Sequence, residues 1–309
     1  METGGQRPLI AVVGPTGVGK SDLALVIAEK FQGEIVNCDS LQVYRHFDLG
    51  TAKVPFAERR GIPHHLLDIA DPDQLFTAGD YARAARAALD EISARGRLPV
   101  LVGGTGFYLS ALLVGLFEGP ERDAALRANL SEREVRRPGA MHRILRRLDP
   151  DAAKRIHPND RNKVMRAVEI CVLARAPLSE LFQTGREPLA GYRTQKLGLN
   201  PSRARLYETL DERMRGMFDA GLCDEVRRIL SLGYSPSAKP FESIGYKQAL
   251  ALVLGQMTEE QAVTDAQRET RRYSKRQMTW FRRDETIVWF EGFGSEPAIQ
   301  EAALETICR

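Results

Sequence analysis

The sequence predicts an α/β fold in which a parallel sheet forms the core and a helical domain is inserted into it. Two observations predict the sheet: short apolar runs alternate with helical patterns, and each run ends in a glycine-rich or polar turn. A third predicts the insertion, because Arg-rich helical patterns replace the strand pattern over residues 119–196. We therefore expect a core of residues 1–118 and 197–309 and an insertion of residues 119–196.

The elements of the expected sheet alternate along the chain. Residues 9–13 form a continuous apolar run, and residues 22–31 then repeat apolar side chains at helical spacing. The same patterns predict strands at 34–37 and 98–102, and helices at 78–94 and 107–116. Alternation of this kind is typical of parallel strands with helices on both faces of the sheet.

The second half of the chain is mainly helical. The insertion contains helical patterns at 122–130, 139–148 and 162–173, which Pro138, Pro150 and Pro158 separate. After it we expect strands at 194–199 and 286–290, helices at 203–220 and 224–232, and one or two long helices within 258–281. The strand at 194–199 and the two helices after it are expected to rejoin the first sheet, and the strand at 286–290 is expected to be a closing strand.

Composition excludes several classes of protein. The chain has 309 residues, of which 43% are hydrophobic and 28% charged, so it can bury a core without disulfides or structural metals. Its longest apolar runs, such as 9–13, are far shorter than the roughly 20 residues of a membrane-spanning helix. No basic-then-apolar leader precedes them, so we expect a cytoplasmic protein with no membrane partner.

Cysteine and histidine provide no evident metal site. The four cysteines, at 38, 171, 223 and 308, form no C-x-x-C pair and are interpreted as buried or inert thiols. His64 and His65 are adjacent, but neighbours on an extended segment point to opposite sides. A structural role, or a place at the rim of a substrate site, is therefore favoured over metal binding.

Positive charge is concentrated in two segments. Residues 119–196 carry 17 Lys and Arg against 10 Asp and Glu, and residues 267–283 carry 7 against 1, although the net charge of the chain is only +3. A polyanion such as nucleic acid is a natural partner for such segments. Solvated basic helix faces are the alternative.

One glycine-rich segment matches a phosphate-binding motif. Gly14, Pro15, Thr16, Gly17, Val18, Gly19, Lys20 and Ser21 fit G-x-x-x-x-G-K-[ST] between an expected strand and an expected helix. Backbone N–H groups of such a loop converge on phosphate oxygens, Lys20 neutralises them, and the Ser21 hydroxyl can hold Mg²⁺. The core is therefore expected to be P-loop NTPase-like.

The motif alone does not show that the phosphates belong to ATP. The strand at 98–102 ends in Gly103 and Gly104 and not in the Asp that orients metal and water in ATPases. An acid, Asp39, follows the strand at 34–37 instead, at the same carboxyl edge of the sheet as the glycine-rich loop. A base opposite a held phosphate indicates group transfer, although an Asp39-Ser40 helix cap remains an alternative.

Six blocks in order resemble the bacterial tRNA dimethylallyltransferase family. Besides the glycine-rich loop, they are Asp39-Ser40-Leu41-Gln42-Val43-Tyr44-Arg45, Gly50-Thr51-Ala52-Lys53, Ile62-Pro63-His64-His65-Leu66-Leu67-Asp68, Gly103-Gly104-Thr105-Gly106-Phe107-Tyr108 and Lys275-Arg276-Gln277-Met278-Thr279-Trp280-Phe281-Arg282. The blocks span nearly the whole chain, so chance agreement is implausible.

The resemblance implies transfer of a dimethylallyl group from dimethylallyl diphosphate to the exocyclic amine of the adenosine 3′-adjacent to a tRNA anticodon. It implies that the loop binds diphosphate with Mg²⁺ on Ser21, that Asp39 is the general base, and that Thr105 and Arg213 lie at the reacting centre. Arg203 is a second candidate for the diphosphate. We expect a monomer.

The resemblance also implies three tRNA-binding segments. They are Asp39, Ser40, Leu41 and Gln42; Asn162, Lys163, Val164, Met165 and Arg166; and Phe241, Glu242, Ser243, Ile244, Gly245, Tyr246 and Lys247. Basic residues at helical spacing between 268 and 276 could follow a phosphate track. The chain departs from the family at Thr209, where many members have arginine, and at Asn162-Lys163, where a Gln-Arg opening is commoner.

Two alternative functions remain at this stage. An adenylate isopentenyltransferase would modify free AMP or ATP, but a free nucleotide does not require a large basic insertion. A P-loop nucleotide kinase, or an ATP-driven RNA-binding module, is the other alternative. An acidic residue that orients the metal after the strand at 98–102 would support it, and the sequence has none there.

Overall fold

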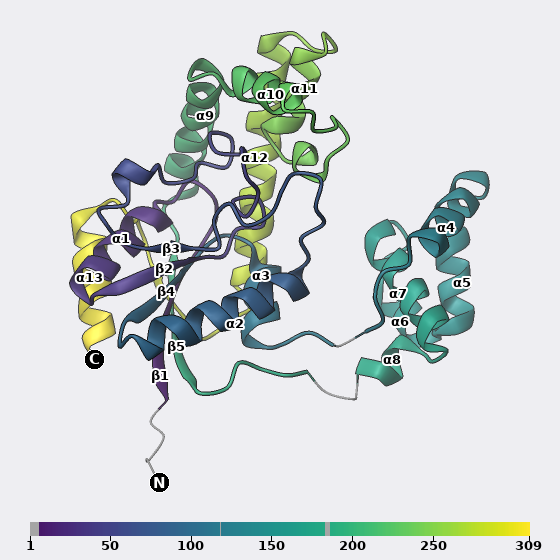
Figure 1. Cartoon of the computed structure of the whole chain (residues 1–309), viewed down its shortest axis with the longest axis horizontal. Coiled ribbons are helices and arrows are strands. Elements are labelled where there is room, and N and C mark those ends of the chain that lie inside the picture. Colours follow the sequence, from purple (N-terminus) through teal and green to yellow (C-terminus); the bar gives the residue numbers. More distant parts are fainter. Residues whose placement is uncertain (1–5, 118, 183–185) are drawn as a thin grey trace. The chain divides into compact units, whose positions relative to one another are not determined.

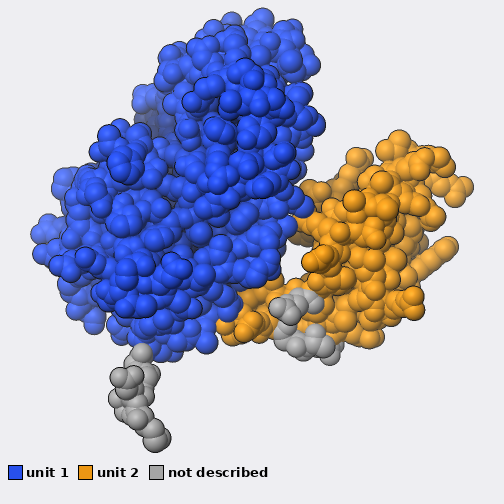
Figure 2. Space-filling model, in the orientation of Figure 1, with its two compact units in different colours: residues 1–113, 189–309 blue, residues 114–188 orange. Residues whose placement is uncertain are grey.

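The computed structural model describes residues 6–117, 119–182 and 186–309 (Figure 1). The chain divides into two compact units, which Figure 2 distinguishes by colour. Unit 1 comprises Met1–Leu113 and Leu189–Arg309, and unit 2 comprises Val114–Pro188. Each unit has its own hydrophobic core.

Unit 1 contains a parallel sheet, to which the described residues contribute six strands. The strands are β1 (Arg7–Val13), β2 (Gly33–Asn37), β3 (His64–His65), β4 (Leu98–Val102), β5 (Tyr192–Leu199) and β6 (Ile287–Phe290), in the order β3-β2-β4-β1-β5-β6. Every adjacent pair is parallel. The central strands are almost fully buried, as expected of a parallel sheet that is covered on both faces.

The register brings the ends of the central strands to one edge. Val102, at the end of β4, pairs with Val12 on one side and with Asn37 on the other. Val13, at the end of β1, pairs with Gly198 in β5. The loops that follow β1, β2 and β4 therefore leave the sheet together, at the carboxyl edge where such folds bind ligands.

Helices cover both faces of the sheet. Leu23 and Ile27 of α1 (Lys20–Lys30) share a core cluster with Val12 and with Ala303 of α13 (Pro297–Cys308). The alternate residues of β1, such as Ala11, are buried as well, and α2 (Ala78–Ala94) contacts β2 and β4 and packs with α3 (Gly106–Leu113). Figure 1 shows α2 and α3 running beside the sheet.

The rest of unit 1 is a second, mainly helical layer. It contains α9 (Arg203–Asp219), α10 (Leu222–Ser231), α11 (Tyr246–Val253), α12 (Glu259–Phe281) and the 3-10 turns η1 (Phe56–Glu58) and η3 (Lys239–Glu242). These helices pack on the loop after β2, because Val43 and Phe47 share a core cluster with Phe241 and Tyr246.

Unit 2 is helical. It contains α4 (Ala124–Arg136), α5 (Ala140–Leu148), α6 (Pro150–Arg155), α7 (Arg161–Ala174) and α8 (Leu178–Leu181) around a core that includes Leu145 and Val168. Glu169 is fully buried within it and accepts hydrogen bonds from Arg127 at 2.8 Å and Arg166 at 2.7 Å. These bonds outweigh the desolvation of the carboxylate, so the pKa of Glu169 is lowered.

The predicted parallel α/β fold is confirmed. α2 has the bounds that its pattern predicts, because Thr77 and Asp80 form a capping box at its start. α12 is one helix and not two. β5 starts at Tyr192, so residues 189–196, which the sequence pattern groups with the insertion, lie in unit 1.

The patterns of the sequence do not predict β3, α6, α8, α11 or α13, and α3 ends at Leu113, before the predicted residue 116. None of the helices in the described part of the chain combines the length and apolar character needed to cross a bilayer.

Candidate active site

The glycine-rich loop joins β1 to α1. Gly17 has a φ of 78°, and a Cβ there would overlap the side chain of Leu210 from α9. Gly19, with a φ of 77°, directly precedes α1. The loop therefore curves tightly around the start of α1, where unpaired backbone N–H groups favour an anion.

Lys20 is held under this loop. Its Nζ atom donates a hydrogen bond to the Pro15 carbonyl at 2.6 Å. Burial lowers the pKa of Lys20 from 10.5 to about 8, and the nearby Asp39 carboxylate opposes that shift. The side chain is thus a poorly solvated cation directed at the anion-binding loop.

One cavity connects the loop with the acidic residue after β2. It has a volume of about 230 Å³ and is lined by Thr16, Gly17, Gly19, Lys20, Ser21, Asp22, Asp39, Gln42, Thr51, Ala52, Val102, Gly103, Gly104 and Arg213. Arg213 from α9 is the second cation of the lining and is partly buried, and the carboxylates of Asp39 and Asp22 lie near it. The cavity therefore has a cationic wall for an anion and a carboxylate across from it.

A larger cavity of about 590 Å³ shares Ala52 and Arg213 with the first. Its lining includes the apolar side chains of Leu49, Val54 and Met217. The two cavities are thus neighbours on either side of these shared residues.

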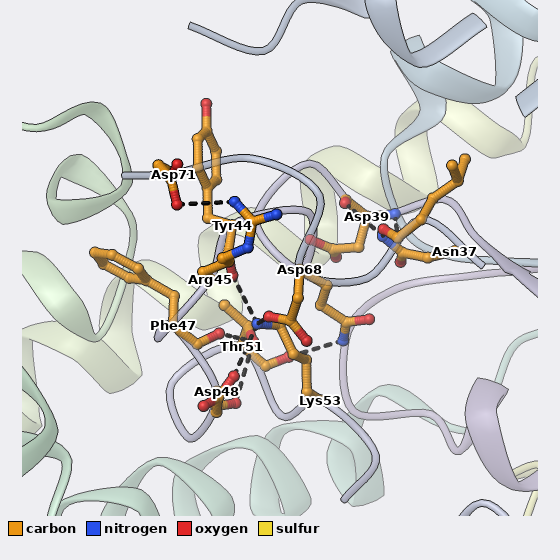
Figure 3. Close-up of polar contacts among 12 residues, drawn as sticks. Asn37, Asp39, Tyr44, Arg45, Phe47, Asp48, Thr51, Lys53, Asp68 and Asp71 are labelled. Carbon is orange, nitrogen blue, oxygen red and sulfur yellow. Dashed lines mark hydrogen bonds and ion pairs between the residues drawn. The ribbon is translucent and has the colours of Figure 1, made fainter. Parts of the chain in front are cut away.

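Asp39 is held by its own loop. Asn37 is buried; its side chain accepts a hydrogen bond from Asp39 N at 3.0 Å and donates to the carbonyls of Asp39 and Leu66 (Figure 3). One carboxylate oxygen of Asp39 accepts from Leu41 N at 2.9 Å. These bonds fix the backbone and orient the carboxylate at the lining of the cavity.

Lys53 braces the outer side of the same region. Its buried Nζ atom donates to the Tyr44 carbonyl at 2.7 Å, to Asp48 at 2.8 Å and to Asp68 at 2.6 Å (Figure 3). The neighbouring Ala52 has a φ of 49° and Asp68 a φ of 56°, a conformation that non-glycine residues rarely adopt. Lys53 therefore stabilises a strained loop that forms one wall of the cavity.

Thr105 contacts the loop that carries Asp39 but does not line the cavity. Its hydroxyl accepts a hydrogen bond from Ser40 N at 3.1 Å, and it is absent from the described residues that line the cavity. The structure therefore brings Thr105 to the residue next to Asp39 and not to the cavity surface. Cys38, on the other side of Asp39, is buried, and burial raises the pKa of its thiol to about 12.

The structure separates Arg203 from Arg213. Gly14, Pro15 and Val18 are buried in the glycine-rich loop, but Arg203 is exposed, with its guanidinium 5.0 Å from the centre of the Tyr207 ring. It precedes Arg213 on α9 by about 15 Å of helix rise. Of the predicted diphosphate residues, Thr16, Gly17, Gly19, Lys20 and Ser21 line the cavity, whereas Gly14, Pro15, Val18 and Arg203 do not.

The predicted tRNA-binding segments contain both surface and core residues. Asn162, Lys163, Glu242 and Lys247 are exposed, Ser243 and Ile244 are partly buried, and Val164, Met165, Phe241, Gly245 and Tyr246 are buried. Arg166 is engaged by Glu169 and by the Pro120 carbonyl. In the first segment Gln42 lines the cavity and donates to the Thr51 carbonyl at 3.0 Å.

The histidine pair has structural partners. His64 Nδ1 lies 2.8 Å from the Ile62 carbonyl, and His65 Nε2 lies 2.7 Å from the buried carboxylate of Glu34. Among the described residues, no three His, Cys, Asp or Glu side chains form a group that could hold a metal ion. Ser21 lines the cavity beside the loop, which fits a Mg²⁺ ion that is held mainly by phosphate oxygens and water.

Three residues of the site region have partners that the sequence does not reveal. They are Asn37, Lys53 and Gln277, whose side chain contacts the glycine-rich loop from α12. Lys53 and Gln277 stand in the blocks that resemble the family, but their polarity alone indicates exposure. Only the structure shows that they are buried.

The fold and cavity define an α/β protein in which a glycine-rich loop and a carboxylate line one cavity. A family model described as IPP transferase matches residues 42–284. A tRNA dimethylallyltransferase of Solibacter usitatus (strain Ellin6076) is 62% identical over 98% of this chain and 98% of the relative. One of Koribacter versatilis (strain Ellin345) is 50% identical over 97% of each.

Solved structures of similar enzymes match the chain over nearly its whole length. The full-length tRNA isopentenylpyrophosphate transferase of Bacillus halodurans is 35% identical, with a TM-score of 0.72 over 98% of this chain and 96% of that one. A eukaryotic dimethylallyltransferase acting on tRNA is 29% identical, with a TM-score of 0.80 over 97% and 78%. The chain belongs to the IPP transferase family.

Proposed function

We propose that this chain transfers a dimethylallyl group from dimethylallyl diphosphate to the exocyclic amine of the adenosine 3′-adjacent to the anticodon in tRNA, with release of diphosphate. The observation that carries the proposal is the single cavity lined by the glycine-rich loop, Arg213 and Asp39. The names of the relatives support tRNA as the acceptor.

The cationic wall of the cavity suits the leaving group. The allylic C–O bond breaks while its carbon develops positive charge, and the electron pair goes to the diphosphate. Lys20, Arg213 and the N–H groups at the start of α1 stabilise the charge that accumulates there. When bound, Mg²⁺ neutralises part of the diphosphate charge, with Ser21 as the protein ligand.

Asp39 serves as the general base. The amine nitrogen forms the new N–C bond and gives a proton to the carboxylate, which contributes about 10² to 10⁴-fold in rate. Thr105 acts through Ser40 and keeps the Asp39 loop in place. The adenosine reaches the cavity only when it is flipped out of the anticodon loop.

Exposed residues of the predicted segments contact the tRNA. They are Asn162 and Lys163 on α7 and Glu242 and Lys247 around the start of α11, together with Arg272, Lys275 and Arg276 on α12. The buried members of the same segments hold those surfaces in shape. We further propose that the enzyme acts as a monomer in the cytoplasm.

The alternatives receive less support. Prenylation of free AMP leaves the basic surfaces without a purpose, and the relatives are named as tRNA enzymes. In a nucleotide kinase an acid would orient the metal after β4, but Gly103 and Gly104 occupy that place.

To test this, the protein is incubated with unmodified tRNA, free AMP, dimethylallyl diphosphate and Mg²⁺. The RNA is then digested, and the masses of the nucleosides and of the AMP are measured by mass spectrometry. We expect one five-carbon unit on tRNA adenosine, whereas prenylated AMP, or phosphate release without transfer, would refute the proposal. Asp39→Asn keeps the oxygen that accepts from Leu41 N. It should lower kcat by about 10² to 10⁴-fold and leave tRNA affinity nearly intact, and a large loss of affinity would assign Asp39 to tRNA binding.

A further inference from the structure

Gln277 connects a distant helix to two loops of the site. The side chain projects from α12 and is only 6% exposed. Its Oε1 atom accepts a hydrogen bond from Thr16 N at 2.9 Å, and its Nε2 atom donates to the Gly104 carbonyl at 2.9 Å. Both hydrogen-bonding ends of the carboxamide are thus used on loops that line the cavity.

Missing side chains allow this close approach. A Cβ at Gly104 would overlap the Nε2 atom of Gln277, and a Cβ at Gly106 would overlap the indole of Trp280 one helical turn further along α12. The helix is therefore seated directly against the backbone of the loop after β4. Glycine at both positions is a condition for that contact.

The two bonds reach two different loops that line the cavity. Thr16 is the first residue of the glycine-rich loop that lines the cavity, where the diphosphate would bind. Gly104 directly precedes Thr105, whose hydroxyl accepts a hydrogen bond from the backbone N–H of Ser40, the residue after Asp39. A displacement of Gly104 would thus be passed through Thr105 to the base. Gln277 is the described side chain that hydrogen-bonds to both loops.

We propose that Gln277 is a positioning residue for prenyl transfer, which sets the separation between the diphosphate loop and the loop that supports Asp39. This inference rests on the proposed function. A side chain that only filled space would be replaced by methionine, which has nearly the same length, at little cost to activity. A positioning role requires both ends of the carboxamide.

Gln267 provides a matched control on the same helix. Its Nε2 atom donates to the backbone carbonyl of Asp211 at 2.9 Å, and it is absent from the described lining of the cavity. Gln277→Met and Gln267→Met therefore make the same substitution in α12, and both remove hydrogen bonds to backbone. Only the first releases loops of the site.

The experiment measures kcat and the KM for dimethylallyl diphosphate at saturating tRNA, the Kd for tRNA and the thermal midpoint. Relative to Gln267→Met, we expect Gln277→Met to lower kcat/KM for dimethylallyl diphosphate about tenfold or more, as the loss of two hydrogen bonds implies. The tRNA Kd should match the control because Gln277 is buried, whereas the thermal midpoint should fall further than in the control, since two hydrogen bonds of a buried side chain are lost instead of one.

Equal kcat/KM values for the two methionine variants would overturn the proposal. If Gln277→Met does not fold, Gln277→Glu decides, because it keeps the acceptor for Thr16 N but loses the donor to Gly104. This variant should also lose kcat, and a wild-type kcat would overturn the proposal. An unaltered chain that transfers no prenyl group would refute the proposed function instead, and the calorimetric affinity for dimethylallyl diphosphate would then test Gln277.

Discussion

Lys20 should make the binding of the prenyl donor depend on pH. Burial lowers the pKa of Lys20 from 10.5 to about 8. In the free protein the ammonium form is therefore lost as the pH rises through 8, although a solvated lysine would still be charged. A bound diphosphate favours the ammonium form, so binding above this pKa must take up a proton.

The size of the effect follows from the pKa. If only the ammonium form binds the diphosphate, the apparent Kd is nearly unchanged at about pH 7 and rises about tenfold at about pH 9. Folding has the opposite dependence: between about 8 and 10.5 the unfolded chain holds more protons than the folded chain, so stability rises with pH in that window.

Calorimetric titration with dimethylallyl diphosphate and Mg²⁺, without tRNA, measures the Kd and the number of protons taken up on binding. Repeating it in buffers of different ionisation enthalpy at about pH 8 should show an uptake of about half a proton. The last ionisation of the donor's phosphate lies near about pH 6, below this range. Lys20→Met should bind more weakly and without this pH dependence.

A wild-type Kd that stays constant between about pH 7 and pH 9, or a Lys20→Met variant that keeps the full slope, would refute this reasoning. In the first case Lys20 would remain charged in the free protein. In the second, another group would be the one that titrates.

Three further perturbations test other parts of the structure. Lys53→Met removes the buried cation that pairs with two half-exposed aspartates, so it should lower the free energy of unfolding by about 2 kcal/mol in urea denaturation. A variant with wild-type stability would show that Lys53 does not stabilise this loop. The pKa of Glu169 is lowered in the folded chain, so its carboxylate stabilises unit 2 at pH values above the ordinary pKa of 4.5. This stabilisation is lost as the pH falls through the lowered pKa. In urea denaturation, the free energy of unfolding of Glu169→Gln should lack this dependence on acid pH. In Gly106→Ala the new methyl group would overlap Trp280, so this variant should lose prenyl transfer to tRNA. Gly216→Ala is the control, because a Cβ there meets no atom within 4 Å, and its effect should be neutral or stabilising. An active Gly106→Ala enzyme would show that α12 can shift.

Local patterns predict most of the sheet because its strands are short, buried and continuous in their apolar character. β1 and β4 lie where their apolar runs predict. β3 has only His64 and His65, too few residues for any period to show. Its place in the sheet depends on pairing with β2, which is a tertiary contact.

The anion site follows from sequence to a similar extent. A glycine-rich loop between a strand and a helix, with an acid after another parallel strand, must lie at one edge of the sheet. The distinction between Arg203 and Arg213 does not follow, since both are arginines on one helix. Arg213 is partly buried and lines the cavity, on the same helix whose Leu210 packs against Gly17, whereas Arg203 is exposed.

Charge counts overstate the surface that is open to RNA. The insertion has an excess of basic residues, but Arg127 and Arg166 are bound to the buried Glu169 and hold unit 2 together. Exposed residues such as Arg146 and Arg155 remain able to approach a polyanion. A basic segment therefore identifies a partner only after its structural ion pairs are subtracted, and burial, which the sequence does not show, decides which residues are left.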